Sequence, residues 1–336
     1  MGKIIKIILR TCLPFALGLG ILGWMYRGTD WEAFRTCVMH DMKWSWMVLS
    51  LAFGILPQVA RALRWNMALE PLGEHPRHRT CIDAIFLSYA SSLVIPRSGE
   101  VTRCGTLKTY DGVSFTKSLG TVVTERLVDS LLMLLLSAAA LLTQIPVFLR
   151  FLTATGTDFG QLPAHFSATG YLVTALCVVA AAFLSFVLLR RYSVFSKGKD
   201  LMRNLWEGII SLRKIRNFPL YLFYSLLIWA GYFLHFYIAF FCFDFTVGIR
   251  PEAALLIFCV GSFAVLVPTP NGAGPWHFAV KTMLVLYGTA ETNAVLFVLV
   301  VHTIQTALVV LLGALGWADL LLAGKNTPPA PEPSEP

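Results

Sequence analysis

Six apolar stretches, each long enough to cross a lipid bilayer, constrain this chain more than any other feature. They cover residues 4–25, 44–63, 118–145, 171–189, 218–243 and 292–322. A helix rises about 1.5 Å per residue, so about 20 apolar residues cross the hydrocarbon core of a bilayer, which is about 30 Å thick. Hydrophobic residues make up 56% of the chain and charged residues only 14%, which excludes a soluble globular domain. The sequence therefore predicts an all-α polytopic membrane protein with about six transmembrane helices.

Two further apolar stretches are too short to cross. Residues 81–95 and 253–267 each span about fifteen residues, and each ends at a proline followed by a polar turn with glycine, at 96–100 and 268–274. Proline lacks the amide hydrogen that continues a helix, and glycine permits positive φ. Both stretches indicate re-entrant or broken helical hairpins. Such backbone survives at membrane depth only where protein or a water-filled cavity surrounds it.

The basic residues divide unevenly between the segments that connect these stretches. Segments 1–10, 64–80, 97–117 and 190–217 hold 18 lysines and arginines, and the remaining connecting segments hold five. Because cytoplasmic loops carry the excess of basic residues, the first group faces the cytoplasm. We expect a multi-pass protein of the cytoplasmic (inner) cell membrane with both termini in the cytoplasm. The net charge of +8 then reflects loops that face an anionic leaflet, and no nucleic acid partner is expected.

This orientation predicts one integral membrane domain, residues 1–323, made of two halves. The halves, about 1–150 and 165–323, have the same element order and opposite orientation, which is the inverted repeat of many transporters. The alternative is an asymmetric bundle with two ordinary short helices. Residues 324–336 form a proline-rich tail that we expect to be disordered.

Neither the N-terminal pattern nor the cysteine spacing indicates a functional site. A basic N-terminus precedes an apolar stretch, as in a signal peptide, but no small-residue cleavage site follows, so an uncleaved first helix is expected. None of the seven cysteines forms a CxxC pair. We therefore expect no disulfide framework, no metal site and no cofactor.

The third long stretch carries three ionisable residues close together. Charged groups at bilayer depth cost about 2.5–3.5 kcal/mol or more each. Glu125 and Asp129 are i,i+4 neighbours, and Arg126 can pair with Asp129. One interpretation is a charged lining for a lipid head group or a proton path. The other is an internal salt bridge to the segment of Arg97, Glu100 and Arg103.

Arginines near two predicted helix ends are candidate anion ligands. Arg97 and Arg103 flank Glu100 at the first helix break, where exposed backbone donors and guanidinium groups suit a phosphate or carboxylate. Positioning of cytoplasmic charge explains them equally. Arg61 and Arg64 lie one turn apart before a tryptophan. They could form a phosphate clamp, but we favour the interpretation that they anchor the helix end at the cytoplasmic interface by the positive-inside rule.

The second break has its own polar group. Gly272 and Gly274 let the backbone approach a ligand, and the helix that follows attracts anions at its N-terminus. Histidines in apolar helices are also common as satisfied core residues. The candidate head-group residues of this half are Asn271, Gly272, Gly274, His277, Lys281, His302 and Gln305.

Several functional motifs do not occur in the sequence. There is no GxxxxGK[ST] loop, so we expect no ATP-hydrolysing site on this chain. There is also no HExxH metalloprotease motif. Ser98 and Ser262 lack a convincing base for a serine hydrolase. We assign no catalytic residue.

Four sequence blocks together resemble a known family. RALRW at 61–65, IPRSGEVTRCG at 95–105, TERLVD at 124–129 and PTPNGAGPWHFAVK at 268–281 resemble the flippase-like, or lysylphosphatidylglycerol synthase transmembrane-region, family. The resemblance covers about residues 5–323. It implies an integral membrane protein that moves or handles lipids. In members fused to a soluble transferase domain, the membrane part is associated with translocating an aminoacylated phospholipid.

The chain departs from the family in two respects. It stops after the membrane part, so the resemblance does not imply lipid aminoacylation. Many members carry a glutamate where this chain has His277, and the Trp276-His277 pair looks like a subgroup variant.

The favoured hypothesis is a flippase or scramblase for an anionic phospholipid or a polyprenyl-phosphate-type lipid. Arg97, Arg103 and Arg126 would neutralise the head group, and Glu125 and Asp129 would order those arginines or carry protons. The glycine-rich turn of the second half would bind the head group from the other side. Without ATP, transport is downhill or coupled to protons or other ions.

Two other hypotheses remain. The chain is a structural or accessory protein of envelope assembly, in which case the polar cluster only holds the fold together. Or it is an intramembrane lipid-modifying enzyme that uses Glu125, Asp129 or His277 as acid or base. The sequence fixes neither the lipid, the direction of transport nor the oligomeric state.

Overall fold

The computed structural model describes residues 18–23, 25–27, 31–154, 215–267 and 269–324. All regular elements in these ranges are helices. The chain forms two compact units, one of Met1–Ala140 with Leu212–Pro336 and one of Leu141–Ser211. All candidate site residues named above belong to the first unit. The tail from residue 325, which we expect to be disordered, lies outside the described residues. That residues 1–323 form a single membrane domain stays a prediction.

Four described helices are long and apolar enough to span a membrane. They are α3 (Trp44–Leu69), α6 (Phe115–Ala154), α10 (Phe218–Ala239) and α13 (Glu291–Ala323). They confirm four of the six predicted spans. The predicted span 171–189 lies outside the described residues, and of 4–25 only residues 18–23 and 25 are described, as helix. The short elements are α2 (Trp31–Thr36), η1 (Cys37–Asp41), η2 (Glu70–Leu72) and η3 (Phe240–Cys242).

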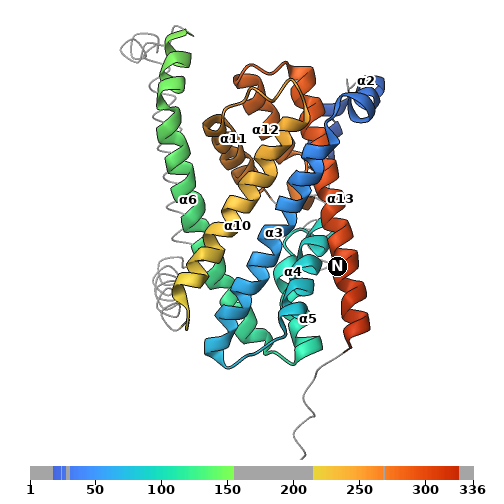
Figure 1. Ribbon diagram of the computed structural model, residues 1–336, viewed down its shortest axis with the longest axis vertical. Helices are drawn as coiled ribbons and strands as arrows, with labels where there is room; N and C mark the ends of the chain where they lie inside the picture. The colour runs from blue at the N-terminus through green and yellow to red at the C-terminus, as the bar shows by residue number, and fades with distance from the viewer. Residues whose placement is uncertain (1–17, 24, 28–30, 155–214, 268, 325–336) are drawn as a thin grey trace, which may run out of the picture. The chain divides into compact units, whose positions relative to one another are not determined.

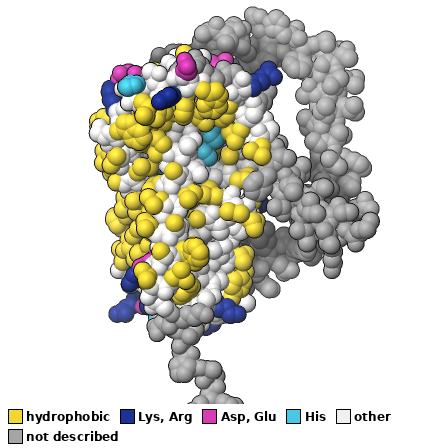
Figure 2. Space-filling view, turned by 90° about the vertical axis from the view of Figure 1, so that its right-hand side faces the viewer, with side chains coloured by type: hydrophobic (Ala, Val, Ile, Leu, Met, Phe, Trp, Pro, Cys, Tyr) yellow, Lys and Arg dark blue, Asp and Glu magenta, His cyan; other side chains and the backbone are white. Residues whose placement is uncertain are grey.

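The outer surface of these helices is apolar. Leu131 and Leu134 on α6 are 59% and 58% exposed, and Leu311 and Leu315 on α13 are 55% and 54% exposed. Figure 2 shows hydrophobic side chains over the middle of the visible face and charged side chains gathered at its ends. A soluble protein would not expose such a band, whereas lipid tails cover it without cost. The chain is an all-α, multi-pass membrane protein.

The two short apolar stretches form the first arms of helical hairpins. α4 (His78–Val94) ends at a break in which Arg97 has a φ of 66°, and α5 (Gly99–Asp111) then packs back against α4. α11 (Pro251–Ala264) is followed by η4 (Pro270–Gly272) and by α12 (Pro275–Leu286), which packs back against α11. The prediction of broken hairpins is confirmed. Most of segment 97–117, which the charge argument treated as a connection, is the second arm α5.

The hairpins enter from opposite ends and meet at their breaks. Figure 1 shows α4 and α5 at one end of the bundle and α11 and α12 at the other. Nη2 of Arg97 donates a hydrogen bond to the carbonyl oxygen of Leu266, at 3.1 Å, and α4 contacts η4. The broken backbone is therefore covered by protein, as membrane depth requires.

The helices of the two halves interlock. α3 and α10 pack along each other, and Ser50 Oγ donates a hydrogen bond of 2.6 Å to the carbonyl of His235. The last helix of each half packs against the first arm of the other half's hairpin. α13 lies on α4, and α6 contacts α11 through Met133, Ala140 and Cys259. The order and crossed packing of the described helices agree with an inverted repeat, which stays a prediction because the span 171–189 and most of the span 4–25 lie outside the described residues.

The contact of α13 with α4 depends on two glycines. A Cβ atom added at Gly313 would lie 2.3 Å from Cβ of Ala90, and one at Gly316 would lie 3.2 Å from the carbonyl oxygen of Asp83. No larger side chain fits between these backbones. By contrast, a Cβ at Gly105 in α5 would meet nothing within 4 Å.

We expect Gly313→Ala to destabilise the protein by about 1–3 kcal/mol, because the added methyl group overpacks the contact with Ala90. The matched control Gly105→Ala is expected to be neutral or to stabilise by up to about 1 kcal/mol, since alanine favours a helix over glycine. Unfolding in detergent by heat or denaturant measures both. Equal stability of the two variants would contradict the close packing of α13 on α4.

Candidate functional site

Five charged residues from three helices meet inside the first unit. Arg61 and Arg64 lie one turn apart on α3, and Glu125 and Asp129 lie one turn apart on α6. This spacing brings each pair onto one face of its helix. Arg103 comes from α5, one turn after its first residue. None of the five side chains belongs to a residue more than 5% exposed.

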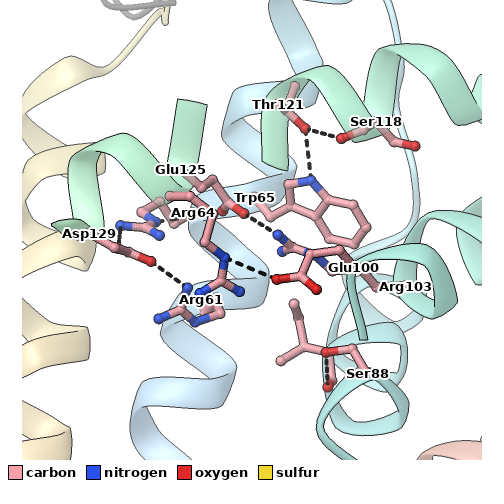
Figure 3. A network of polar contacts seen from close by, with 12 residues as sticks. Arg61, Arg64, Trp65, Ser88, Glu100, Arg103, Ser118, Thr121, Glu125 and Asp129 are labelled. Atoms are coloured by element: carbon pink, nitrogen blue, oxygen red, sulfur yellow. Dashed lines mark hydrogen bonds and ion pairs between the residues drawn. The ribbon is translucent and has the colours of Figure 1, made fainter. Parts of the chain in front are cut away.

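These residues form a chain of alternating charge, which we call the buried network (Figure 3). Asp129 joins the two arginines of α3, with 2.6 Å from Oδ2 to Nη1 of Arg61 and 2.8 Å from Oδ1 to Nη1 of Arg64. Glu125 continues the chain, with 3.7 Å from Oε1 to Nε of Arg64 and 2.8 Å from Oε2 to Nη2 of Arg103. Arg61 and Arg103 are its two ends.

The buried network has one positive charge more than it has negative charges. Three guanidinium groups face two carboxylates, and the terminal arginines each have a single carboxylate partner. Nε of Arg61, Nη2 of Arg64 and Nη1 of Arg103 are buried donors without a hydrogen-bond partner among the described residues. Unused donors beside excess positive charge can bind an anion.

A small cavity lies at the two ends of the network. Its volume is about 50 Å³, which is room for a few water molecules. Glu100 and Arg126 also face it, with 3.3 Å between Oε1 of Glu100 and Nε of Arg126. The lining residues are Arg61, Arg103, Arg126, Glu100, Gly99, Ile85, Ser88, Tyr89 and Ser92.

Aromatic and hydroxyl side chains hold the arginines in place. The guanidinium of Arg103 lies 4.6 Å from the ring centre of Trp65, and that of Arg64 lies 5.6 Å from the ring centre of Tyr221. Arg64 Nη1 donates to Ser225 Oγ at 3.1 Å, and Trp65 Nε1 donates to Thr121 Oγ1 at 2.9 Å. No sequence pattern singled out Thr121, Tyr221 or Ser225; the one signal is the i,i+4 spacing of Tyr221 and Ser225 in an apolar helix.

Two predictions for the first half were wrong. Arg64 and Trp65 are fully buried, so they are not interfacial anchors. Arg126 pairs with Glu100 and not with Asp129, because Asp129 faces α3. The expected internal salt bridges between the third long stretch and the segment of Arg103 are present.

Arg97 lies outside the buried network. Its guanidinium reaches the end of the second hairpin, at the Leu266 carbonyl, and does not line the cavity. It therefore joins the two hairpin breaks.

The second half forms a separate polar group around the break at η4. Asn271 has a φ of 52° and its Nδ2 donates to Thr306 Oγ1 at 2.7 Å. His302 Nε2 lies 3.2 Å from the Asn271 carbonyl oxygen, and the rings of His277 and His302 have centres 4.2 Å apart. Nδ1 of His277 accepts a hydrogen bond from the backbone N–H of Gly274 at 3.3 Å. These contacts hold the turn in place.

The remaining predicted residues of that half have local roles. Lys281 Nζ pairs with Glu291 Oε1 at 2.7 Å, and Gln305 Nε2 is buried without a partner among the described residues. The positive φ values of Gly272 and Gly274 form the turn. A Cβ at Gly274 would lie 3.1 Å from the Gly18 carbonyl oxygen, so the glycine allows the backbone at Gly18 to pack closely against the turn.

Five described cysteines, Cys37, Cys81, Cys104, Cys242 and Cys259, are buried and free. Over the described ranges no group of three or more histidine, cysteine, aspartate or glutamate side chains is placed to hold a metal ion.

Comparison with known proteins identifies one relationship. The model of the family described as "Lysylphosphatidylglycerol synthase TM region" matches residues 12–313, nearly the whole chain. No curated protein and no solved structure matches significantly. The family that the sequence blocks resembled is thereby confirmed.

We expect Asp129→Asn to lower the free energy of unfolding by about 3–5 kcal/mol, because it leaves the guanidinium groups of Arg61 and Arg64 buried without their shared carboxylate. Asp244→Asn is the matched control. Its exposed pair with Lys43 should contribute less than about 1 kcal/mol. Denaturant unfolding in detergent measures both, and a loss for Asp129→Asn no larger than for the control would contradict the network as drawn.

Proposed function

The chain belongs to the lysylphosphatidylglycerol synthase transmembrane-region family, and we propose on this premise that it is a lipid flippase or scramblase. The cargo is an anionic phospholipid or a polyprenyl-phosphate-type lipid. Its phosphate binds at the cavity between Arg61 and Arg103 while its hydrocarbon chains stay in the bilayer. The protein lies in the cytoplasmic (inner) cell membrane with both termini in the cytoplasm.

One observation carries the proposal: the excess positive charge of the buried network lies at its ends, beside the cavity. A buried charge without a counter-charge is costly, and an anionic head group would supply the missing one. Arg126 adds a third guanidinium at the cavity, and Gly99 brings the N-terminal end of α5 to it, where anions are favoured. The hydroxyl hydrogens of Ser88 and Ser92 are donated to the carbonyl oxygens of Ile85 and Ser88, so the guanidinium groups supply the donors for the phosphate oxygens.

The cavity of about 50 Å³ is too small for a whole lipid head group, so the described conformation is closed. Opening requires the two hairpin breaks to separate. The hydrogen bond from Arg97 to Leu266 and the contact of α4 with η4 oppose that separation. In this mechanism the hairpins act as inner and outer gates on a head-group path near the membrane midplane. With no ATP-binding loop in the sequence, transport runs downhill or is coupled to an ion.

The alternative function is structural. Each carboxylate of the network has an arginine nitrogen within 2.8 Å, so the network also serves simply to bind α3, α5 and α6 together. In that case the protein is an accessory of envelope assembly and moves no lipid. Lipid-modifying catalysis has less support, because Glu125 and Asp129 are both occupied by arginine partners.

We expect Arg126→Gln to slow lipid transbilayer movement about tenfold or more, because a charged hydrogen bond to the head group is lost. The Arg126 side chain is half exposed, so the variant should fold. The assay uses purified protein in liposomes with head-group-labelled anionic lipid. Arg250→Gln, which removes another exposed arginine paired with a glutamate, should leave the rate unchanged. No transport by the wild type would support the structural alternative, and unchanged transport in Arg126→Gln would remove Arg126 from the head-group site.

We expect Arg97→Ala to speed the same movement about two- to tenfold, since one hydrogen bond that holds the hairpin breaks together is removed. The liposome assay above gives the rate, with Arg250→Gln again as the control. A slower rate would instead make Arg97 a ligand of the head group, as its position before Glu100 in the sequence suggested.

A further inference from the structure

A second carboxylate pair lies where the two halves contact each other, away from the buried network. Asp83 of α4 is only 6% exposed, and Asp319 belongs to the last turns of α13. Gly316 contacts the backbone of Asp83, and Asp319 follows Gly316 by three residues on the same face of α13, which brings the two carboxyl groups into hydrogen-bonding contact. Oδ2 of Asp83 receives no hydrogen bond from any N–H or O–H group among the described residues. A buried carboxylate oxygen in this position lacks a donor.

The charges around this pair do not balance unless a proton is present. Arg79 forms an ion pair with Asp319. Arg77, just before α4, forms an ion pair with Asp111 at the end of α5, with 2.7 Å between Nε and Oδ1. The charged groups that face Asp83 are therefore Arg77 before α4, Arg79 of α4 and Asp319 of α13. One arginine therefore serves two carboxylates. A hydrogen bond between two carboxyl groups needs a proton on one of them, because ionised carboxylates only accept.

The pair lies beside the close contact of α13 with α4. Gly316 lies against the backbone of Asp83, where a Cβ would come within 3.2 Å of the Asp83 carbonyl oxygen. Two carboxylates forced together there would repel each other. A proton removes the repulsion and joins them.

We propose that Asp83 and Asp319 form a proton-binding site that clamps the first hairpin onto the last helix of the other half. With the proton bound, the carboxyl pair holds α4 against α13. Loss of the proton weakens this contact. The site is separate from the head-group cavity, and the proposal does not rest on lipid transport. This assignment places proton binding at Asp83 and Asp319 and not at Glu125 and Asp129, which are each paired with arginines.

The direct test is the pH dependence of stability. A carboxyl pair that holds a proton in the folded protein but not in the unfolded chain loses stabilisation as pH rises. Between about pH 5 and about pH 8, the melting temperature of the wild type in detergent should therefore fall relative to that of Asp83→Asn by at least about 2 °C. The side-chain amide of asparagine can donate a hydrogen bond to Asp319 at every pH in this range. Asp244→Asn, a matched change of an exposed carboxylate, should follow the wild type.

Infrared spectroscopy of the wild type gives an answer even if Asp83→Asn does not fold. The protonated pair should show a carboxylic acid C=O stretch at neutral pH that disappears at high pH. The exchange Asp319→Asn, at a partly exposed position, should remove this band, and Asp244→Asn should not. Parallel melting profiles of wild type and Asp83→Asn, or no such band, would overturn the proposal. Absence of lipid transport would leave both results unaffected.

Discussion

The alternating network of Arg61, Asp129, Arg64, Glu125 and Arg103 is the interaction on which the rest of the structure depends. Ionised groups inside a membrane protein must be matched by opposite charge, since no water solvates them. Matching here joins α3, α5 and α6 through side-chain atoms as close as 2.6 Å. The network has one carboxylate fewer than it has arginines, and the arginines at both of its ends line the cavity. The same residues thus hold three helices together and create a preference for an anion.

The second constraint is that the backbone at the two helix breaks must be covered by protein. Each hairpin exposes backbone groups at its break, and these need protein around them. The two breaks cover each other, and the last helix of each half lies on the first arm of the opposite hairpin. Movement of either hairpin must therefore disturb the other half. The Asp83–Asp319 contact is on one of these crossing points, which makes it a place where a proton could change the coupling between halves.

The sequence predicted the four described spans, both breaks and the charged residues that meet in the buried network, because long apolar runs, proline-glycine turns and charges in apolar stretches leave strong signals. It did not predict their partners. Spacing alone allowed Asp129 to pair with Arg126 on its own helix, but the Asp129 side chain faces the arginines of α3. Arg64 and Trp65 were assigned to the interface, since loop charge rules do not distinguish a helix end from a buried face. Tyr221 and Ser225 went unnoticed because α10 is apolar nearly all round, so no face stands out.

The central claim is that an anionic head group occupies the cavity at the ends of the buried network. Photo-cross-linking in native membranes tests it most directly, with a photoreactive amino acid in place of Ser92 at the cavity wall and, in a second variant, in place of Leu131 on the outer face of α6. Mass spectrometry then identifies the attached lipid. The account predicts an adduct at position 92 that is enriched in anionic lipids relative to the adduct at position 131. Adducts at position 131 alone, or the same lipid mixture at both positions, would contradict it.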